Sequence, residues 1–230
     1  MIKHSRALQD LLLAEGYDAE EELEIITSRQ YQLSQKDHWE NNGVLNDILR
    51  WSQKGRDALL WVGGSSGNQD TWVTELSADT IIALQPQLVT MLFVFCTQRG
   101  NQPITPLGLV RRLIVQLLDK HPELAYQNPE ICSLSKFQKS VSFGQTWRIF
   151  EALATGVQNL FLIIDRIEEC EADEQADLVH QLLPRLIEFG RGNENVSVIV
   201  TSIYNPPDEA AELLLYATYI DTSKRAGRRG

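Results

Sequence analysis

The chain has 230 residues, of which 43% are hydrophobic and 23% charged, ordinary values for a globular protein with a buried core. A net charge of −10 argues against nucleic acid as the main ligand. The three cysteines form no C-x-x-C pair, the four histidines lack metal-ligand spacing, and no apolar run is long enough for a membrane span. We therefore expect a soluble, cytoplasmic protein in a reducing compartment, without structural zinc and with no nucleic acid or membrane as partner.

The first 51 residues are predicted to contain a helical segment before the main domain and a helix at its start. Residues 1–35 contain leucines at helical spacing and an acidic patch over 18–24, and we assign them to an N-terminal helical segment or linker. A second helix is expected from Trp39 to Trp51, with Val44 and Ile48 among its apolar positions. The main domain is assigned to 36–222, and the basic tail at 223–230, which carries four positive charges, is expected to be disordered.

Short apolar runs alternate with amphipathic segments through the rest of the chain. The runs predicted as strands are 58–62, 88–96, 160–165 and 196–202, with a short fifth strand at 219–220. The segments predicted as helices are 71–84, 106–120, 143–155, 173–190 and 206–216, with a short helix within 121–140. Thr105 is positioned to cap the helix that starts at Pro106. This alternation predicts an α/β fold with a parallel sheet flanked by helices.

The first strand runs into a Gly/Ser-rich turn that resembles a phosphate-binding P-loop. Its template is G-x-x-x-x-G-K-[ST], in which backbone N–H groups and a lysine surround the phosphates. The residues aligned with this template are Gly64, Ser65, Ser66, Gly67, Asn68, Gln69, Asp70 and Thr71. Gly64 fits the first glycine and Thr71 fits the magnesium-binding hydroxyl, whereas Gln69 replaces the second glycine and Asp70 replaces the lysine.

These two replacements oppose nucleotide binding. A carboxylate at Asp70 about 4 Å from a phosphate charge costs roughly 4 kcal/mol per charge pair at an effective dielectric near 20. The Cβ atom of Gln69 fills space that glycine leaves open for the approach of the backbone. We therefore expect no ordinary hydrolysis of nucleoside triphosphates, no catalytic residue and no cofactor.

A second motif follows the strand at 160–165. Four apolar residues lead into Asp165, as in a Walker B strand, whose terminal carboxylate holds the hydrated Mg²⁺ beside the P-loop. Many core strands end on an aspartate, but its position downstream of the P-loop favours a nucleotide-binding fold. If nucleotide binds, Thr71 and Asp165 are the expected Mg²⁺ ligands and Glu169 the expected catalytic acid. A divalent cation held by Asp70, Asp165, Glu168 and Glu169 without nucleotide is a further alternative.

The chain resembles the NACHT-type P-loop domain of the STAND class, in its nephrocystin-3-like N-terminal form, over about 28–215. The segments that carry the resemblance are 39–51, 59–64, 92–96, 109–118, 122–124, 163–165, 168–170 and 200–202. The usual family forms are similar to L-L-W-I-x-G-x-P-G-S-G-K-S-T, I-D-x-L-D-E-C and V-T-S-R-P. The departures are Gln69, Asp70, Ile203 in place of the arginine after the last strand, and the milder change to Glu168.

The resemblance implies a module of a multidomain signalling protein, with other domains or other proteins as partners. Because the departures gather at the phosphate, we expect a degenerate nucleotide-binding module that acts as a regulatory or scaffold domain. The alternative is a molecular switch that binds ATP or GTP with Mg²⁺ and hydrolyses it weakly. It is supported by Thr71, Asp165 and Glu169, which match the family pattern.

Overall fold

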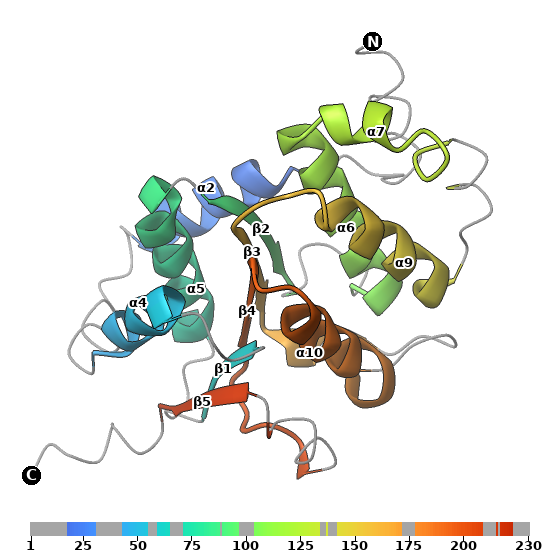
Figure 1. Ribbon diagram of the computed structural model, residues 1–230. Helices are drawn as coiled ribbons and strands as arrows, with labels where there is room; N and C mark the ends of the chain where they lie inside the picture. Colours follow the sequence, from blue (N-terminus) through green and yellow to red (C-terminus); the bar gives the residue numbers. More distant parts are fainter. Residues whose placement is uncertain are drawn as a thin grey trace, which may run out of the picture.

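A computed structural model describes residues 18–30, 43–54, 59–64, 71–87, 89–96, 104–133, 137, 142–171, 178–208, 215 and 217–222. Within these ranges five strands form one parallel sheet in the order β2-β3-β4-β1-β5 (Figure 1). They are β1 (Leu59–Gly63), β2 (Thr90–Phe95), β3 (Leu160–Asp165), β4 (Val196–Thr201) and β5 (Ala217–Asp221). The predicted α/β fold class is confirmed, and β4 separates β1 from β3.

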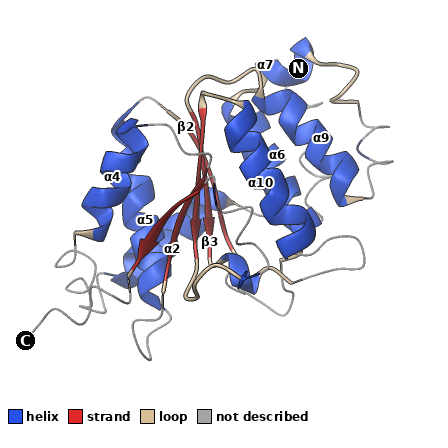
Figure 2. Cartoon of the chain, turned by 60° about the horizontal axis from the view of Figure 1, so that its bottom comes forward, coloured by secondary structure: helices blue, strands red, loops and turns tan. Residues whose placement is uncertain are grey.

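Helices cover both faces of the sheet, which is seen between two helical layers in Figure 2. One layer contains α2 (Ala19–Gln30), α4 (Val44–Lys54) and α5 (Thr71–Leu84). The other contains α6 (Pro106–Lys120), α7 (Glu123–Gln127), α9 (Phe143–Ala154) and α10 (Leu183–Gly192). The chain crosses from β1 to β2 through α5 and returns to β3 and β4 through the opposite layer. Right-handed crossovers require this change of face when the direction of travel reverses.

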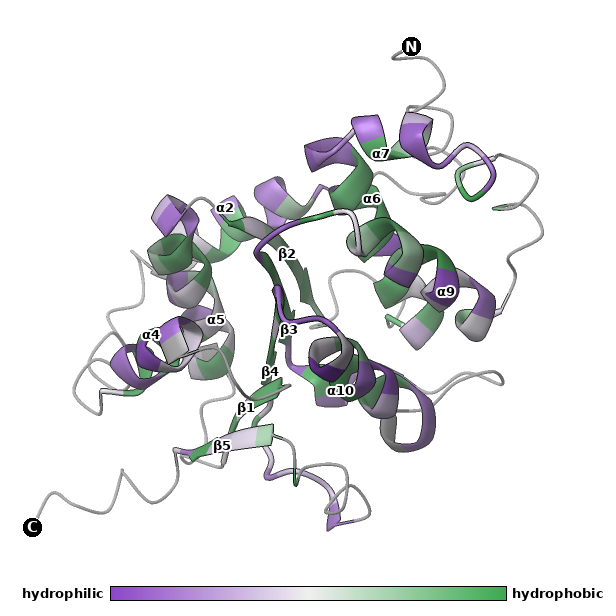
Figure 3. Cartoon of the chain, viewed as in Figure 1, coloured by the Kyte–Doolittle hydropathy of each residue, from purple (hydrophilic) through white to green (hydrophobic). Residues whose placement is uncertain are grey.

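Strands β1 to β4 are predominantly apolar because this part of the sheet is buried on both faces. In β3, Leu160, Leu162 and Ile164 pack toward α6 and α9, whereas Phe161 and Ile163 pack toward α5. Figure 3 shows β2 as hydrophobic and β5 as paler. No helix in the described part of the chain combines the length and apolar character needed to cross a bilayer.

A strand and a helix cap agree with the sequence prediction, and one predicted helix differs for a clear reason. The predicted strand 160–165 matches β3, and Thr105 caps α6 by accepting a hydrogen bond from Gly108 N at 3.2 Å. Of the helix predicted over 173–190, residues 173–177 lie outside the described residues, and the rest forms a π-helical turn at Leu178–Leu182 followed by α10. Pro184 has no N–H and its ring clashes with the carbonyl four residues earlier, which favours a wider turn. Most of the helix predicted over 206–216 lies outside the described residues.

The free edge of β2 is closed by a side chain. Gln116 of α6 accepts a hydrogen bond from Phe93 N at 3.0 Å and donates one to Phe93 O at 2.7 Å. Both groups of Gln116 are buried, so the outward-facing peptide groups of Phe93 are satisfied without a sixth strand. The glutamine thus replaces one step of a β-ladder.

Candidate functional site

The carboxyl ends of β1, β3 and β4 meet at one edge of the sheet. In a parallel α/β sheet this edge is where ligands bind. The parallel register places Val62 of β1 beside Thr201 of β4, and Phe95 of β2 beside Asp165 of β3. The sequence-predicted Asp165 therefore lies at the same edge as the start of the P-loop segment.

Two glycines lead from β1 into the P-loop segment, each for a different physical reason. Gly64 has φ of +116°, a backbone conformation that favours glycine. A Cβ atom on Gly63 would lie 2.4 Å from Tyr204 O and 2.7 Å from Trp61 Nε1, so a side chain does not fit there. Thr222, after β5, donates from Oγ1 to the carbonyl oxygens of Gly63 and Gly64 at 3.1 Å. The entry to the loop is thereby fixed in place.

Most of the predicted phosphate-binding residues cannot be placed. Residues 65–70, which include Gln69 and Asp70, lie outside the described residues, as does the side chain of Thr71. The structure does show that α5 begins at Thr71, directly after the loop segment, as the motif predicts. The roles assigned to Gly64–Thr71 remain predictions.

Asp165 is fully buried and accepts hydrogen bonds from three hydroxyl groups. Thr74 and Ser77 of α5 donate to Oδ2 and Oδ1, each at 2.7 Å, and Thr201 of β4 donates to Oδ1 at 2.8 Å. The Ser77 and Thr201 oxygens are themselves 3.1 Å apart. The carboxylate thus joins one helix to two adjacent strands.

These hydroxyl groups are polar but carry no charge that compensates the carboxylate. Burial raises the pKa of Asp165 to about 6, while the hydrogen bonds from Ser77, Thr74 and Thr201 act in the opposite direction. The nearby charge of Glu168 raises the pKa further. Asp165 therefore changes its protonation state near pH 6 rather than near pH 4.

A buried arginine follows Asp165 and pairs with both glutamates of the acidic motif. Arg166 has a left-handed backbone (φ 53°, ψ 52°), and a 3₁₀ turn over Ile167–Glu169 comes next. Its Nε donates to Glu168 Oε1 at 2.5 Å, and its Nη2 donates to Glu169 Oε1 at 2.6 Å. Glu168 Oε1 also accepts a hydrogen bond from Ile203 N at 3.3 Å. We call Arg166, Glu168 and Glu169 the arginine cluster.

The arginine cluster accounts for the surroundings of two predicted positions. Glu169, the expected catalytic acid, is 35% exposed at its side chain and is ion-paired. Ile203, which replaces the family arginine, is half-buried and packs against the α5 side of the core. Its backbone N–H donates a hydrogen bond to Glu168 of the acidic motif.

The sequence analysis missed the partners of the acidic residues. Thr74 and Ser77 are three residues apart on α5, which places both on one helical face, and this spacing was a usable signal. Arg166 stands between Asp165 and Glu168 in the sequence, so its charge was also visible. Its left-handed backbone was not, because arginine rarely adopts positive φ.

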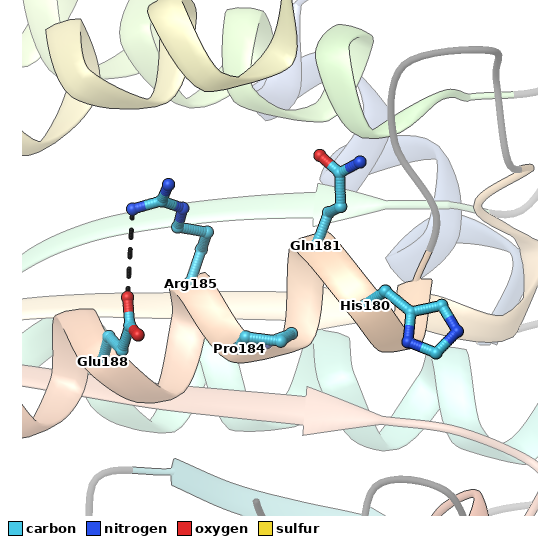
Figure 4. Close-up of a pocket in the computed structure, with 5 residues that line it drawn as sticks. All are labelled: His180, Gln181, Pro184, Arg185 and Glu188. Atoms are coloured by element: carbon cyan, nitrogen blue, oxygen red, sulfur yellow. Dashed lines mark ion pairs between the residues drawn. The ribbon is translucent and has the colours of Figure 1, made fainter.

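The described residues do not form a metal site at this edge. Within those ranges no three His, Cys, Asp or Glu side chains are arranged to hold a metal ion. The cation alternative also involves Asp70, which is not described. A pocket lies on the helical stretch 178–192, as Figure 4 shows. Its lining residues are His180, Gln181, Pro184, Arg185 and Glu188.

Comparison with known proteins agrees with the fold. The family model described as Nephrocystin 3, N-terminal, matches residues 44–203, which is most of the chain. No curated protein sequence matches the chain. The chain belongs to the nephrocystin 3 N-terminal family, and it is a P-loop NTPase-related domain.

Proposed function

We propose that this member of the nephrocystin 3 N-terminal family is a degenerate nucleotide-binding module. It keeps the P-loop fold, does not hydrolyse nucleotide, and acts as a regulatory or scaffold domain of a larger signalling protein. Its partners are other proteins or other domains, and its location is the cytoplasm. The observation that carries the proposal is that the acidic residues expected at Mg²⁺ and at water are bound to groups of the chain itself.

The environment of Asp165 supports this proposal. An ionised carboxylate offers about four lone-pair sites, and three hydroxyl groups of the fold occupy three of them. A Mg²⁺ ion with its water ligands needs the same oxygens. One lone-pair site of Asp165 therefore remains for the hydrated ion, and any further contact with the ion requires breaking a buried hydrogen bond.

The arginine cluster gives independent support. A glutamate that orients water for attack on phosphate needs a free oxygen directed at that water. One oxygen of Glu169 accepts a hydrogen bond from Arg166 at 2.6 Å. Arg166 is itself held by Glu168 at the same time, so its charge is shared between two carboxylates. It is a poor substitute for the missing P-loop lysine.

The competing function is an ATP- or GTP-binding switch with weak hydrolysis. One feature favours this function, namely the position of Asp165. It ends β3 at the edge where α5 begins, as a carboxylate that holds Mg²⁺ does. Asp70 then has to be accommodated beside a phosphate, at a cost of roughly 4 kcal/mol per charge pair.

Calorimetric titration distinguishes the two functions. ATP, ADP and GTP with Mg²⁺ are titrated into the wild-type chain and into a variant that carries Gln69→Gly and Asp70→Lys. We expect no heat of binding from the wild type and micromolar binding by the variant, because the lysine and glycine restore the motif. Micromolar binding by the wild type would refute the proposal.

A matched control separates the local effect from the change in total charge. Glu188→Lys makes the same charge change on α10, where the Glu188 side chain is 68% exposed. This variant is expected to bind nucleotide no better than the wild type. If it gains the same affinity, the gain reflects net charge rather than the P-loop.

A further inference from the structure

The two edges of the sheet differ in what lies against them. At the β2 edge, the side chain of Gln116 binds the outward-facing peptide groups of Phe93. β5 forms the opposite edge, and among the described residues β1 is the only strand that pairs with it (Figure 1). An edge strand of this kind presents peptide groups with which a strand of another molecule can pair.

The hydrogen bonds between β5 and β1 determine which peptide groups of β5 face outward. Thr222 N donates to Gly63 O at 2.9 Å, and Gly63 lies beside Asp221 in the parallel register. In a parallel ladder, alternate residues direct their peptide groups to the same neighbouring strand. Thr222 and every second residue before it therefore face β1, whereas Tyr219 faces outward. In the described part of the chain, no residue hydrogen-bonds to the N–H or the carbonyl oxygen of Tyr219.

The side chain of Tyr219 is also accessible. Tyr219 is 39% exposed, and its hydroxyl donates to Asn205 Oδ1 at 2.5 Å, which fixes the position of the ring. Tyr204, after β4, and Leu215, before β5, are exposed as well. Half of the six large hydrophobic residues that are exposed in the described ranges thus belong to the segment 204–219. Such a concentration favours an interaction surface.

We propose that the β5 edge binds the β5 edge of a second copy of this chain, so that the two sheets join into one. The two strands run antiparallel about a two-fold axis that passes between the two Tyr219 residues. Each Tyr219 then donates its outward N–H to the carbonyl oxygen of Tyr219 in the other copy, as in a hydrogen-bonded antiparallel pair. This inference does not depend on the proposed function.

The sequence of β5 is compatible with pairing to itself. The strand has five residues, and Tyr219 is the central one. With Tyr219 opposite itself, Ala217 lies opposite Asp221 of the second copy. Thr218 lies opposite Ile220. The charged side chain of the strand therefore faces alanine rather than a like charge, and the two tyrosine rings lie on the same face of the joined sheet. Aromatic pairs in this position stabilise antiparallel strands.

The wild-type chain tests the proposal directly. Sedimentation velocity is measured under reducing conditions from low micromolar to several hundred micromolar protein. We expect the mass to rise from 26.1 kDa toward twice that value. Over the same concentrations, hydrogen exchange of peptides that cover β5 should slow, because the N–H of Tyr219 becomes hydrogen-bonded. A mass of 26.1 kDa at every concentration would overturn the proposal, and so would a dimer without slower exchange in β5.

Variants of Tyr219 test the two-fold register. Tyr219→Lys places two positive charges directly opposite each other, and it leaves the ladder between β1 and β5 in place because the peptide groups of Tyr219 face outward. We expect the dissociation constant of the dimer to rise by about tenfold or more. Tyr219→Glu should have the same effect. An equimolar mixture of the two variants should dimerise again, since lysine then faces glutamate.

Three outcomes of the variant measurements would refute the assigned register. They are dimers of either variant as tight as the wild-type dimer, a mixture that stays monomeric, and an equal loss of dimer in a control variant. The control is Tyr126→Lys, which makes the same charge change on α7, where Tyr126 is 47% exposed. It should leave the dissociation constant unchanged. The hydrogen exchange of the wild type decides the question even if a variant fails to fold.

Discussion

The end of β3 stabilises acidic residues in two different ways within five residues. Asp165 is surrounded by the hydroxyl groups of Thr74, Ser77 and Thr201, which carry no formal charge. Glu168 and Glu169 are paired with the guanidinium of Arg166 instead. In the first arrangement Asp165, Ser77 and Thr201 are buried and Thr74 is partly buried, whereas the second reaches the surface at Glu169.

The difference explains how each arrangement should respond to change. Hydroxyl dipoles compensate only part of the cost of burying a charge. The contribution of Asp165 to the free energy of unfolding therefore depends on pH. A cation compensates the charge of the glutamates directly. The stability of the fold therefore depends on keeping that cation. The three predictions below test this contrast, from the largest expected effect to the smallest.

Removing the cation should give the largest effect. Arg166→Met leaves the two glutamates without their partner, and Glu168 is only 14% exposed at its side chain. We expect the free energy of unfolding to fall by about 3–5 kcal/mol, the range for breaking a buried ion pair. Urea denaturation followed by circular dichroism measures this change.

The control for Arg166 is an exposed arginine. Arg185 is 39% exposed and lies 3.8 Å from Glu188, so Arg185→Met should change stability by less than about 1 kcal/mol. Equal losses in the two variants would mean that the arginine cluster is no more important than a surface ion pair.

The pH dependence of Asp165 should give the next effect. Its pKa is raised from 3.8 to about 6, so the folded chain binds a proton more tightly than the unfolded chain. The folded state therefore loses stability as pH rises from about 4 to 6, by about 3 kcal/mol in total at about 1.4 kcal/mol per pKa unit. Above pH 6 this contribution is constant.

Asp165→Asn isolates the pH-dependent contribution of Asp165 to stability, because asparagine keeps the shape of aspartate and does not titrate. The difference in unfolding free energy between wild type and Asp165→Asn should shift against the wild type between pH 4 and 6. The contributions of carboxylates remote from Asp165 are common to both proteins and cancel. A difference that is flat across this range would refute the assignment of the titration to Asp165.

Removing a single hydroxyl should give the smallest effect. Thr74→Val keeps the shape of the side chain and deletes the hydrogen bond to Asp165 Oδ2. We expect a loss of about 1.5–3 kcal/mol at pH 7, the range for a hydrogen bond to a charged group. The loss should be smaller at pH 4, where Asp165 is protonated, and the pKa of Asp165 should rise further. An equal loss at both pH values would contradict this reading.

The sequence predicted the sheet well because burial on both faces leaves long apolar runs. The limits of β3 were predicted to the residue, since its apolar run ends abruptly at Asp165. β5 was predicted only at 219–220, although it extends over Ala217–Asp221. As an edge strand it is partly exposed, and its mixed composition gives a weak signal.

The candidate site was predicted less completely because its contacts are long-range. Asp165 was identified by its position after an apolar run, a local pattern. Its hydroxyl partners on α5 lie 88 and 91 residues away in the sequence, and no spacing rule connects residues so far apart. Arg166 reaches both glutamates from a turn in which its own φ is positive. Arginine rarely adopts positive φ, so the sequence did not predict this turn.

The contact between Gln116 and Phe93 has a consequence for assembly. An edge strand with free peptide groups is a template on which a strand of another molecule can pair, and this is a common route to aggregation. A strand of another molecule that pairs with β2 at Phe93 must first displace the buried side chain of Gln116, which makes two hydrogen bonds there. The contact of Gln116 with Phe93 thus disfavours pairing of a foreign strand at this position of β2.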